Sequence, residues 1–253
     1  MHNWVYKGLA TGIRTTTYPA RPDERPGISP GRPRGTSLVQ PAAEALARIC
    51  PTQAITQQPT GAAVDHRRCV HCSRCRRDLG ALSMDWESGF EWGALAEQTL
   101  TAGRRFKKIF GHSLHIRFVD AGACGACMSE ARQLNNPYYN IHRLGFFITP
   151  TPRDADILLV AGPVTDAMRV PLLKTYEAMP KPKRVVAMGV CAVSGGIFGP
   201  SFISAGGVSD VIPVDVVIPG CPPPPLAILH GLLLAVERAK PAPLFSAAPS
   251  TSA

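Results

Sequence analysis

The eight cysteines of the sequence are its most reactive side chains, and they fall into two groups of four. The first group is Cys50, Cys69, Cys72 and Cys75, and the second is Cys124, Cys127, Cys191 and Cys221. Thiolates are the protein ligands that soft metals and iron–sulfur clusters prefer. The first twenty residues contain no apolar segment typical of an export signal. We therefore expect a cytoplasmic protein whose thiols stay reduced and available to metals.

The first group has the spacing of ferredoxin cysteines, in which a C-x2-C-x2-C-x3-C-P run supplies cluster ligands. Three of its members fit the start of such a run, namely Cys69, Cys72 and Cys75, and Leu79 stands at the fourth position. Cys50 is followed by a proline, as the last cysteine of such a run would be. The three positions that would precede it in the run are occupied by Gln40, Ala43 and Leu46.

In a two-cluster ferredoxin, one cluster takes three cysteines from one run and the Cys-Pro cysteine from the other. That set is complete here, whereas all four ligands of the other cluster are missing together. The first group therefore predicts one [4Fe–4S] cluster, held in a small α+β ferredoxin-like domain over residues 37–85. Four cysteines also suit tetrahedral zinc. Zinc remains the alternative, although the close C-x2-C-x2-C spacing and the Cys-Pro pair favour iron–sulfur.

The second group is spread over three segments, and each segment directly follows a predicted strand. These strands are residues 114–120, 184–189 and 214–220. Because ligands of an open parallel sheet bind beyond the carboxyl ends of its strands, we expect the four thiols to meet at one sheet edge. The second group therefore predicts a second [4Fe–4S] cluster.

Strands and helices alternate through the same region. Short apolar runs predict further buried strands at residues 145–150 and 155–162. The predicted helices are residues 128–144, interrupted at Pro137, then 165–178 with Thr165 as N-cap, and 224–240. This alternation is typical of an α/β domain with a doubly wound parallel sheet, which we place at residues 113–240.

Residues 114–238 resemble the 20 kDa-type small subunit shared by respiratory complex I and the membrane-bound energy-converting [NiFe] hydrogenases. The matching stretches are DADILLVAGPVT, MGVCAVSGGIFG and GGVSDVIPVDVVIPGCPP, together with Glu130 three residues after Cys127. The resemblance implies a flavodoxin-like fold and one [4Fe–4S] cluster beside the active site of a large subunit. Complex I subunits carry adjacent cysteines at the first ligand position, whereas Cys124 and Cys127 have the C-x2-C spacing of the hydrogenase branch.

The resemblance implies an iron–sulfur electron-transfer subunit of a membrane-associated hydrogenase-like complex of the formate hydrogenlyase or hydrogenase-4 type. Its partners would be a large catalytic subunit, [NiFe]-type or 49 kDa-like, and membrane subunits that hold it at the inner face of the cytoplasmic membrane. Glu130 would lie near the cluster, within reach of proton transfer, or else serve as a carboxylate at a helix N-terminus. A complex I-like NADH or quinone oxidoreductase subunit is one alternative, and a redox-sensing or assembly module is another.

The rest of the chain contributes a basic N-terminal arm, a linker and a tail. The net charge is +9, but the arginines are scattered and follow no nucleic-acid-binding signature, so we expect no nucleic acid partner. Residues 1–36 predict a Pro-rich arm with a short amphipathic helix, for which a membrane, a partner or the protein core would be the contact. Residues 86–112 predict a linker, and residues 241–253 a disordered tail.

Overall fold

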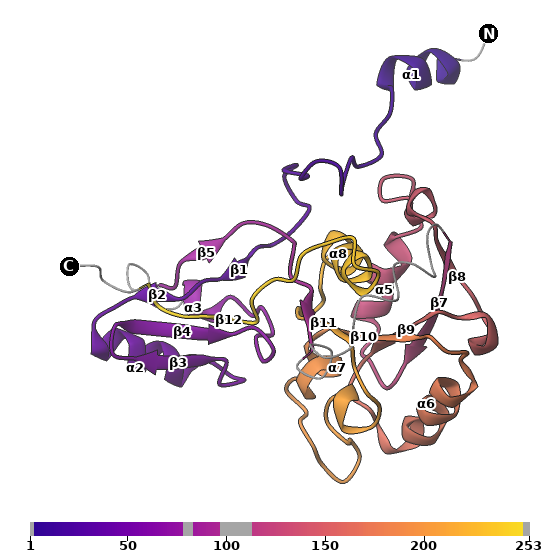
Figure 1. The fold of residues 1–253 in the computed structure, drawn as a ribbon. Coiled ribbons are helices and arrows are strands. Elements are labelled where there is room, and N and C mark those ends of the chain that lie inside the picture. The colour runs from indigo at the N-terminus through magenta and orange to yellow at the C-terminus, as the bar shows by residue number, and fades with distance from the viewer. Residues whose placement is uncertain (1–2, 78–82, 97–112, 250–253) are drawn as a thin grey trace.

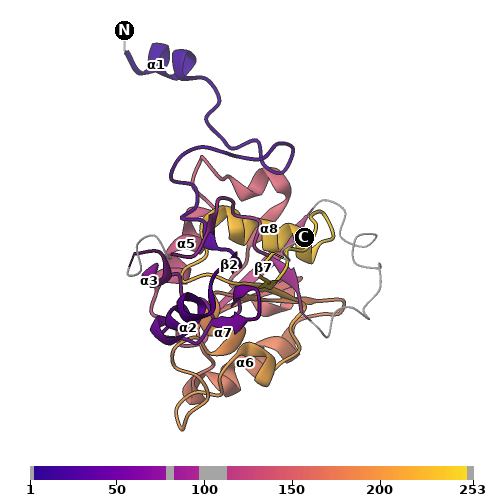
Figure 2. The same ribbon diagram turned by 90° about the vertical axis from the view of Figure 1, so that its left-hand side faces the viewer.

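The computed structural model describes residues 3–77, 83–96 and 113–249, and it contains two units that lie side by side (Figure 1). The larger unit, the sheet domain, is built on a six-stranded sheet. The smaller one, the N-terminal unit, comprises residues 32–77 and 83–87 and lies in front of the sheet domain in Figure 2. Helix α1 (Asn3–Thr11) projects away from both, and none of its residues is buried.

The sheet domain has five parallel strands and one antiparallel edge strand. The parallel strands are β7 (Leu114–Asp120), β8 (Phe146–Ile148), β9 (Ile157–Ala161), β10 (Arg184–Met188) and β11 (Val216–Ile218). The order in the sheet is β6-β11-β10-β9-β7-β8, and β6 (Ala94–Leu95) pairs antiparallel with β11. Counted along the chain, the parallel strands have the order 2-1-3-4-5, which is that of flavodoxin-like folds. The predicted α/β fold class is confirmed.

Helices cover both faces of this sheet, because the buried strands are apolar on both sides. In β9, Leu159 packs in one core with α5 (Ala126–Gln133) and α8 (Pro225–Ala235), whereas Leu158 and Val160 pack in a second core. The second core includes residues of α6 (Asp166–Ala178) and α7 (Val190–Ser194). Such two-sided burial explains why the strands appear as continuous apolar runs in the sequence.

Two sequence-based expectations within the sheet domain are wrong. The helix expected over residues 128–144 ends at Gln133, and only a 3₁₀ turn, Ile141–Leu144, follows. Asn136 explains the early end, since its side-chain oxygen accepts a hydrogen bond from the Tyr138 amide and forms a turn around Pro137. Strand β8 is an edge strand, and its Ile148 is exposed rather than buried. Further 3₁₀ turns are Pro152–Asp154 and Val208–Asp210.

The N-terminal unit consists of short strands around one helix. Its elements are β1 (Arg32–Pro33), β2 (Thr36–Ser37), α2 (Gln40–Ile49), β3 (Ile55–Gln58), β4 (Gly61–Asp65), α3 (Arg74–Arg77) and β5 (Trp86–Glu87). Strand β1 pairs antiparallel with β5, so the unit extends beyond the predicted range 37–85 at both ends. The predicted linker therefore begins with a strand and later contributes β6, while residues 97–112 lie outside the described part of the chain.

The C-terminal segment is ordered where the sequence predicted disorder. Residues Phe245–Ser246 form β12, which pairs antiparallel with β4 of the N-terminal unit. The tail is rich in Pro, Ala and Ser, which predicts disorder, whereas the backbone of β12 finds hydrogen-bond partners at the open edge of a distant strand. Within residues 3–77, 83–96 and 113–249, no helix has the length and apolar character needed to cross a bilayer.

Candidate metal centres

The first cysteine group gathers at one end of the N-terminal unit. Cys50 directly follows α2, and the other three lie in the loop after β4 and in α3. All four line one cavity of about 20 Å3, together with Trp86. Cys75 is buried, Cys50 and Cys69 are half-buried, and Cys72 is exposed. The structure thus brings together the four residues that the spacing predicted as one ligand set.

The loop that carries three of these cysteines turns through two left-handed residues. His71 has φ 51° and Ser73 has φ 60°, so the backbone curls around the cavity. The His71 ring packs edge-on against Trp92, with centroids 4.9 Å apart, and lies 6.4 Å from the ring of Trp86. The His71 ring is therefore held by contacts with both tryptophans.

The residues at the positions of the missing ferredoxin cysteines have other roles in the N-terminal unit. Ala43 and Leu46 are fully buried in the apolar core of the N-terminal unit, on the inner face of α2. Gln40 lies at the start of α2 and donates a hydrogen bond to the carbonyl oxygen of Gln58. Leu79 lies outside the described residues. Apolar packing therefore occupies the region of α2 where a second ferredoxin cluster would need thiols.

The second cysteine group lies at the carboxyl edge of the sheet, as the strand positions predicted. Cys124 lies in the loop after β7, and Cys127 in the first turn of α5. Cys191 belongs to α7 after β10, and Cys221 follows β11. The sulfurs of Cys191, Cys221 and Cys124 lie close enough to Cys127 to act on its pKa. Three separate chain segments therefore bring four thiols to one end of the sheet.

Asp120 and two glycines shape the loop that carries Cys124. The Asp120 carboxylate accepts hydrogen bonds from the Gly122 amide at 2.9 Å and the Ala123 amide at 2.6 Å. Asp120 therefore fixes the backbone at the start of the loop that carries Cys124. Gly122 has φ 111° and Gly125 has φ 91°, a backbone conformation that glycine adopts without strain.

Two further glycines leave room for the cysteine sulfurs. A Cβ atom at Gly189 would lie 2.6 Å from Cys127 Sγ, and one at Gly196 would lie 2.9 Å from Cys191 Sγ. Both distances are shorter than van der Waals contact. The backbone at these glycines is therefore part of the wall around the second cysteine group.

Burial and mutual repulsion keep several thiols protonated when no cation is present. Burial, with smaller contributions from the neighbouring thiols, raises the pKa of Cys69 and of Cys127 to about 12. The same causes raise the pKa of Cys191 to about 11. Such thiols ionise only when a cation compensates the thiolate charges. This chemistry fits a metal group with several positive charges at each site.

The arrangement differs from that of ligands around a single ion. Among the described residues, no group of three or more His, Cys, Asp or Glu side chains is placed to hold one metal ion. The first cavity is small, about 20 Å3, and all four cysteines of the first group line it. Cluster thiolates surround a cube and bind different iron atoms, so the donor number and chemistry fit at both sites.

The two units touch at residues that are close in sequence to both cysteine groups. The hydroxyl of Ser194, three residues after Cys191, donates a hydrogen bond of 2.7 Å to the carbonyl oxygen of Arg67, two residues before Cys69. A nearby cleft of about 620 Å3 is lined from the N-terminal unit by His71 and from the sheet domain by Cys221, among others. No sequence signal indicated that Ser194 and Arg67 would meet.

Glu130 lies on α5 and lines the same cleft. Its side chain is half-buried, and this burial raises the pKa of its carboxyl group above the usual range. Such a carboxyl group takes up and releases protons closer to neutral pH than an exposed one.

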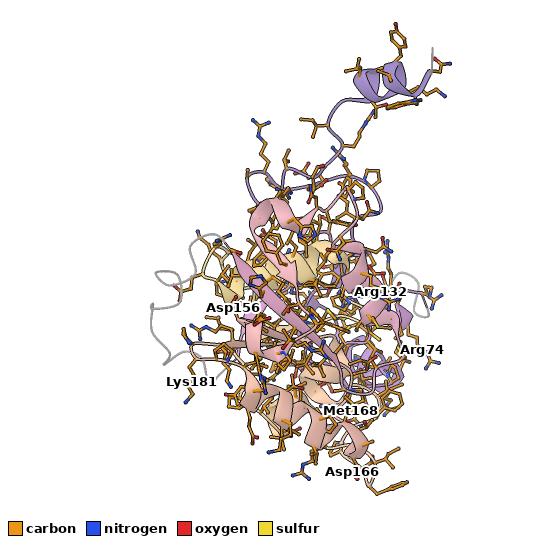
Figure 3. All side chains as sticks on the ribbon, turned by 90° about the vertical axis from the view of Figure 1, so that its right-hand side faces the viewer. Arg74, Arg132, Asp156, Asp166, Met168 and Lys181 are labelled. Atoms are coloured by element: carbon orange, nitrogen blue, oxygen red, sulfur yellow. The ribbon has the colours of Figure 1, made fainter. Side chains whose placement is uncertain are left out.

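Two exposed arginines, Arg74 and Arg132, extend from the two units on the same side of the molecule (Figure 3).

Comparisons with known proteins match the sheet domain. Residues 124–235 match the sequence model of the family described as NADH ubiquinone oxidoreductase, 20 Kd subunit. Formate hydrogenlyase subunit 7 of Escherichia coli K12 is 43% identical over 124 residues, 49% of this chain and 49% of that protein. This chain therefore spans about half the length of that relative. The matched range 124–235 includes the second cysteine group and excludes the first.

Two further relatives are a probable hydrogenase subunit and a solved respiratory complex. A probable membrane-bound hydrogenase subunit of Pyrococcus furiosus is 42% identical over 131 residues, 52% of this chain and 78% of that protein. One chain of an archaeal respiratory complex, the membrane-bound sulfane sulfur reductase, is 34% identical with a TM-score of 0.46. That match covers 52% of this chain and 73% of the other.

Proposed function

The chain belongs to the family of the 20 kDa subunit of NADH–ubiquinone oxidoreductase, a family of oxidoreductase subunits, and we propose that it carries electrons through two [4Fe–4S] clusters. Cys50, Cys69, Cys72 and Cys75 would hold one cluster, and Cys124, Cys127, Cys191 and Cys221 the other. The observation that carries the proposal is the convergence of the second group at the carboxyl edge of the sheet, where Cys127 lies beside three other thiols. Each cluster, when bound, accepts or releases one electron at a time.

The residues of this chain would support electron transfer by holding the cysteines in place and by shielding them from water. Cys127 and Cys75 are buried, so part of each site is shielded from solvent. Asp120 fixes the loop of Cys124, and the glycine backbone at Gly189 packs directly against the Cys127 sulfur. Burial and nearby hydrogen-bond donors are the means by which a protein adjusts cluster potentials.

We further propose that the terminal chemistry takes place on a large partner subunit of a membrane-associated, hydrogenase-like complex. The C-x2-C spacing of Cys124 and Cys127 and the names of two relatives support this choice over a quinone reductase. Attachment to the membrane would come through other subunits of that complex. Glu130, on the cleft beside Cys221, is the residue of this chain best placed to pass protons near the second site.

The test is hydrogen-dependent viologen reduction by the complex, purified anaerobically through a tag on this chain. In the unaltered complex we expect this activity and about eight iron atoms per chain, as two cubes require. In Cys124→Ser we expect the activity to be lost. A complex that holds this iron but reduces no viologen with hydrogen contradicts the hydrogenase assignment and favours the quinone-linked alternative. A complex without iron contradicts the electron-transfer role itself.

A further inference from the structure

The C-terminal segment, residues 241–249, crosses from the sheet domain to the N-terminal unit, and we call it the strap (Figure 1). Its start is fixed at α8. The Gly93 amide donates to Nδ1 of the buried His230, and His230 Nε2 then donates to the carbonyl oxygen of Lys240 at 3.0 Å. One residue into the strap, the Ala242 amide donates to the Gly93 carbonyl oxygen at 2.8 Å.

Leu244 belongs to both units at once. Its side chain packs against the core of the sheet domain that contains Val214 and Val217. Its carbonyl oxygen accepts a hydrogen bond of 2.9 Å from the amide of His66, in the N-terminal unit. His66 lies three residues before Cys69, so this bond links the strap to the first cysteine loop.

Beyond Leu244, the strap completes the sheet of the N-terminal unit. Strand β2 pairs with the first part of β4, where Thr36 lies opposite Ala62. Strand β12 pairs with the last part, where Phe245 lies opposite Asp65. Without the strap, the end of β4 would present unpaired backbone groups. Such groups destabilise the fold when they are buried, and they pair with other chains when they are exposed.

Gly35 leaves space for the strap because it has no side chain. Its amide donates a hydrogen bond of 2.9 Å to the hydroxyl of Ser246. A Cβ atom at this position would lie 2.2 Å from the Ala247 carbonyl oxygen, and its three nearest atoms all belong to the strap. Only a glycine therefore lets the strap lie against this turn.

We propose that the strap, assisted by the Ser194–Arg67 contact, holds the two cysteine groups at a fixed separation. Gly35, Leu244 and Ser194 are positioning residues in this arrangement. The inference rests on the proposed function, because it assigns the strap the task of keeping two clusters within electron-transfer distance. The N-terminal unit is small and has a small core, so it needs such a device, since two domains of one chain otherwise move relative to each other.

The test compares Gly35→Ala with Gly8→Ala in the tagged, anaerobically purified complex. A Cβ atom at Gly8 meets no other atom within 4 Å, so this control leaves the strap in place. In Gly35→Ala we expect the amide of His66 to exchange hydrogen about tenfold faster, because its bond to Leu244 opens. We also expect a weaker magnetic interaction between the two reduced clusters, with unchanged iron content and an unchanged spectrum for each cluster alone.

Unchanged exchange at His66 and unchanged magnetic interaction in Gly35→Ala would overturn the proposal. A chain that ends at Lys240 is the second variant, and it must show both effects at least as strongly. If the unaltered complex contains no iron, the proposed function fails, whereas hydrogen exchange at His66 still decides whether the strap holds the two units together.

Discussion

The sulfur of Cys127 lies against the backbone of Gly189, at 2.6 Å from the position that a Cβ atom would take there. Gly189 immediately follows β10, and Cys127 lies in the first turn of α5. Two elements far apart in the sequence therefore meet at one cysteine sulfur. The wall of the second site is formed by main chain, which cannot move aside as a side chain can.

Gly189→Ala is expected to disrupt the second site alone. The added methyl group would displace the Cys127 sulfur, and the φ of 86° at this position is also unfavourable for alanine. Iron should fall from about eight to about four atoms per chain, with the signal of the first cluster retained. Iron analysis and low-temperature EPR measure this, with Gly8→Ala as the control. A variant that keeps all its iron would contradict this prediction, because the backbone around Cys127 would then have moved to accommodate the methyl group.

The two cysteine groups are expected to lose their clusters independently. Cys50→Ser should remove about four iron atoms and leave the second cluster, and Cys191→Ser should do the reverse. The reason is that each set lies in its own unit with its own core. Metal analysis of both variants decides the outcome. Loss of zinc instead of iron in Cys50→Ser would establish the zinc alternative for the first group.

Glu130→Gln is expected to change how stability depends on pH. Burial raises the pKa of Glu130, so the native state binds its proton more tightly than the unfolded state does. The contribution of Glu130 to stability should therefore fall as pH rises above the unfolded value of about 4.3, because the native state must then hold a half-buried charge. The variant lacks this loss, so its relative stability should increase with pH in urea denaturation.

The same variant tests proton transfer separately from stability. If Glu130 passes protons, Glu130→Gln should lower hydrogen-dependent turnover while iron content and cluster spectra stay unchanged. Full turnover together with the altered pH dependence of stability would assign Glu130 a structural role only. Arg132 on the same helix is exposed, and Arg132→Gln is the matched control.

Asp215→Ala is expected to destabilise the sheet domain by about 3 kcal/mol. Arg184 is buried at the start of β10 and donates to the Asp215 carboxylate at 2.8 Å, and the Val185 amide donates to its other oxygen. Removal of the carboxylate leaves a buried guanidinium with a weaker partner, Glu237 at 3.8 Å. Urea denaturation measures the change. The double variant Arg184→Met/Asp215→Ala should recover most of the loss, and equal loss in both would contradict the ion-pair explanation.

The sequence by itself determined the sheet domain and the grouping of its thiols. Apolar runs such as residues 157–161 are local signals, and their alternation with helices specifies a parallel sheet. The position of Cys191 and Cys221 just after strands then predicts where they lie, because all parallel strands end at one edge. The grouping of Cys69, Cys72 and Cys75 could be predicted for a similar reason, because their close spacing in one short loop is itself a local signal.

Only the tertiary structure decided how the two units are joined. Leu244, His66, Gly35 and Ser194 carry no local signal, because each contact joins residues far apart in the chain. The strap is rich in Pro and Ala and gives no local strand signal, and it is ordered by an open strand edge that the sequence of the strap does not encode. Local periodicity specifies elements, whereas the pairing of distant edges depends on which backbone groups remain unsatisfied after the elements pack.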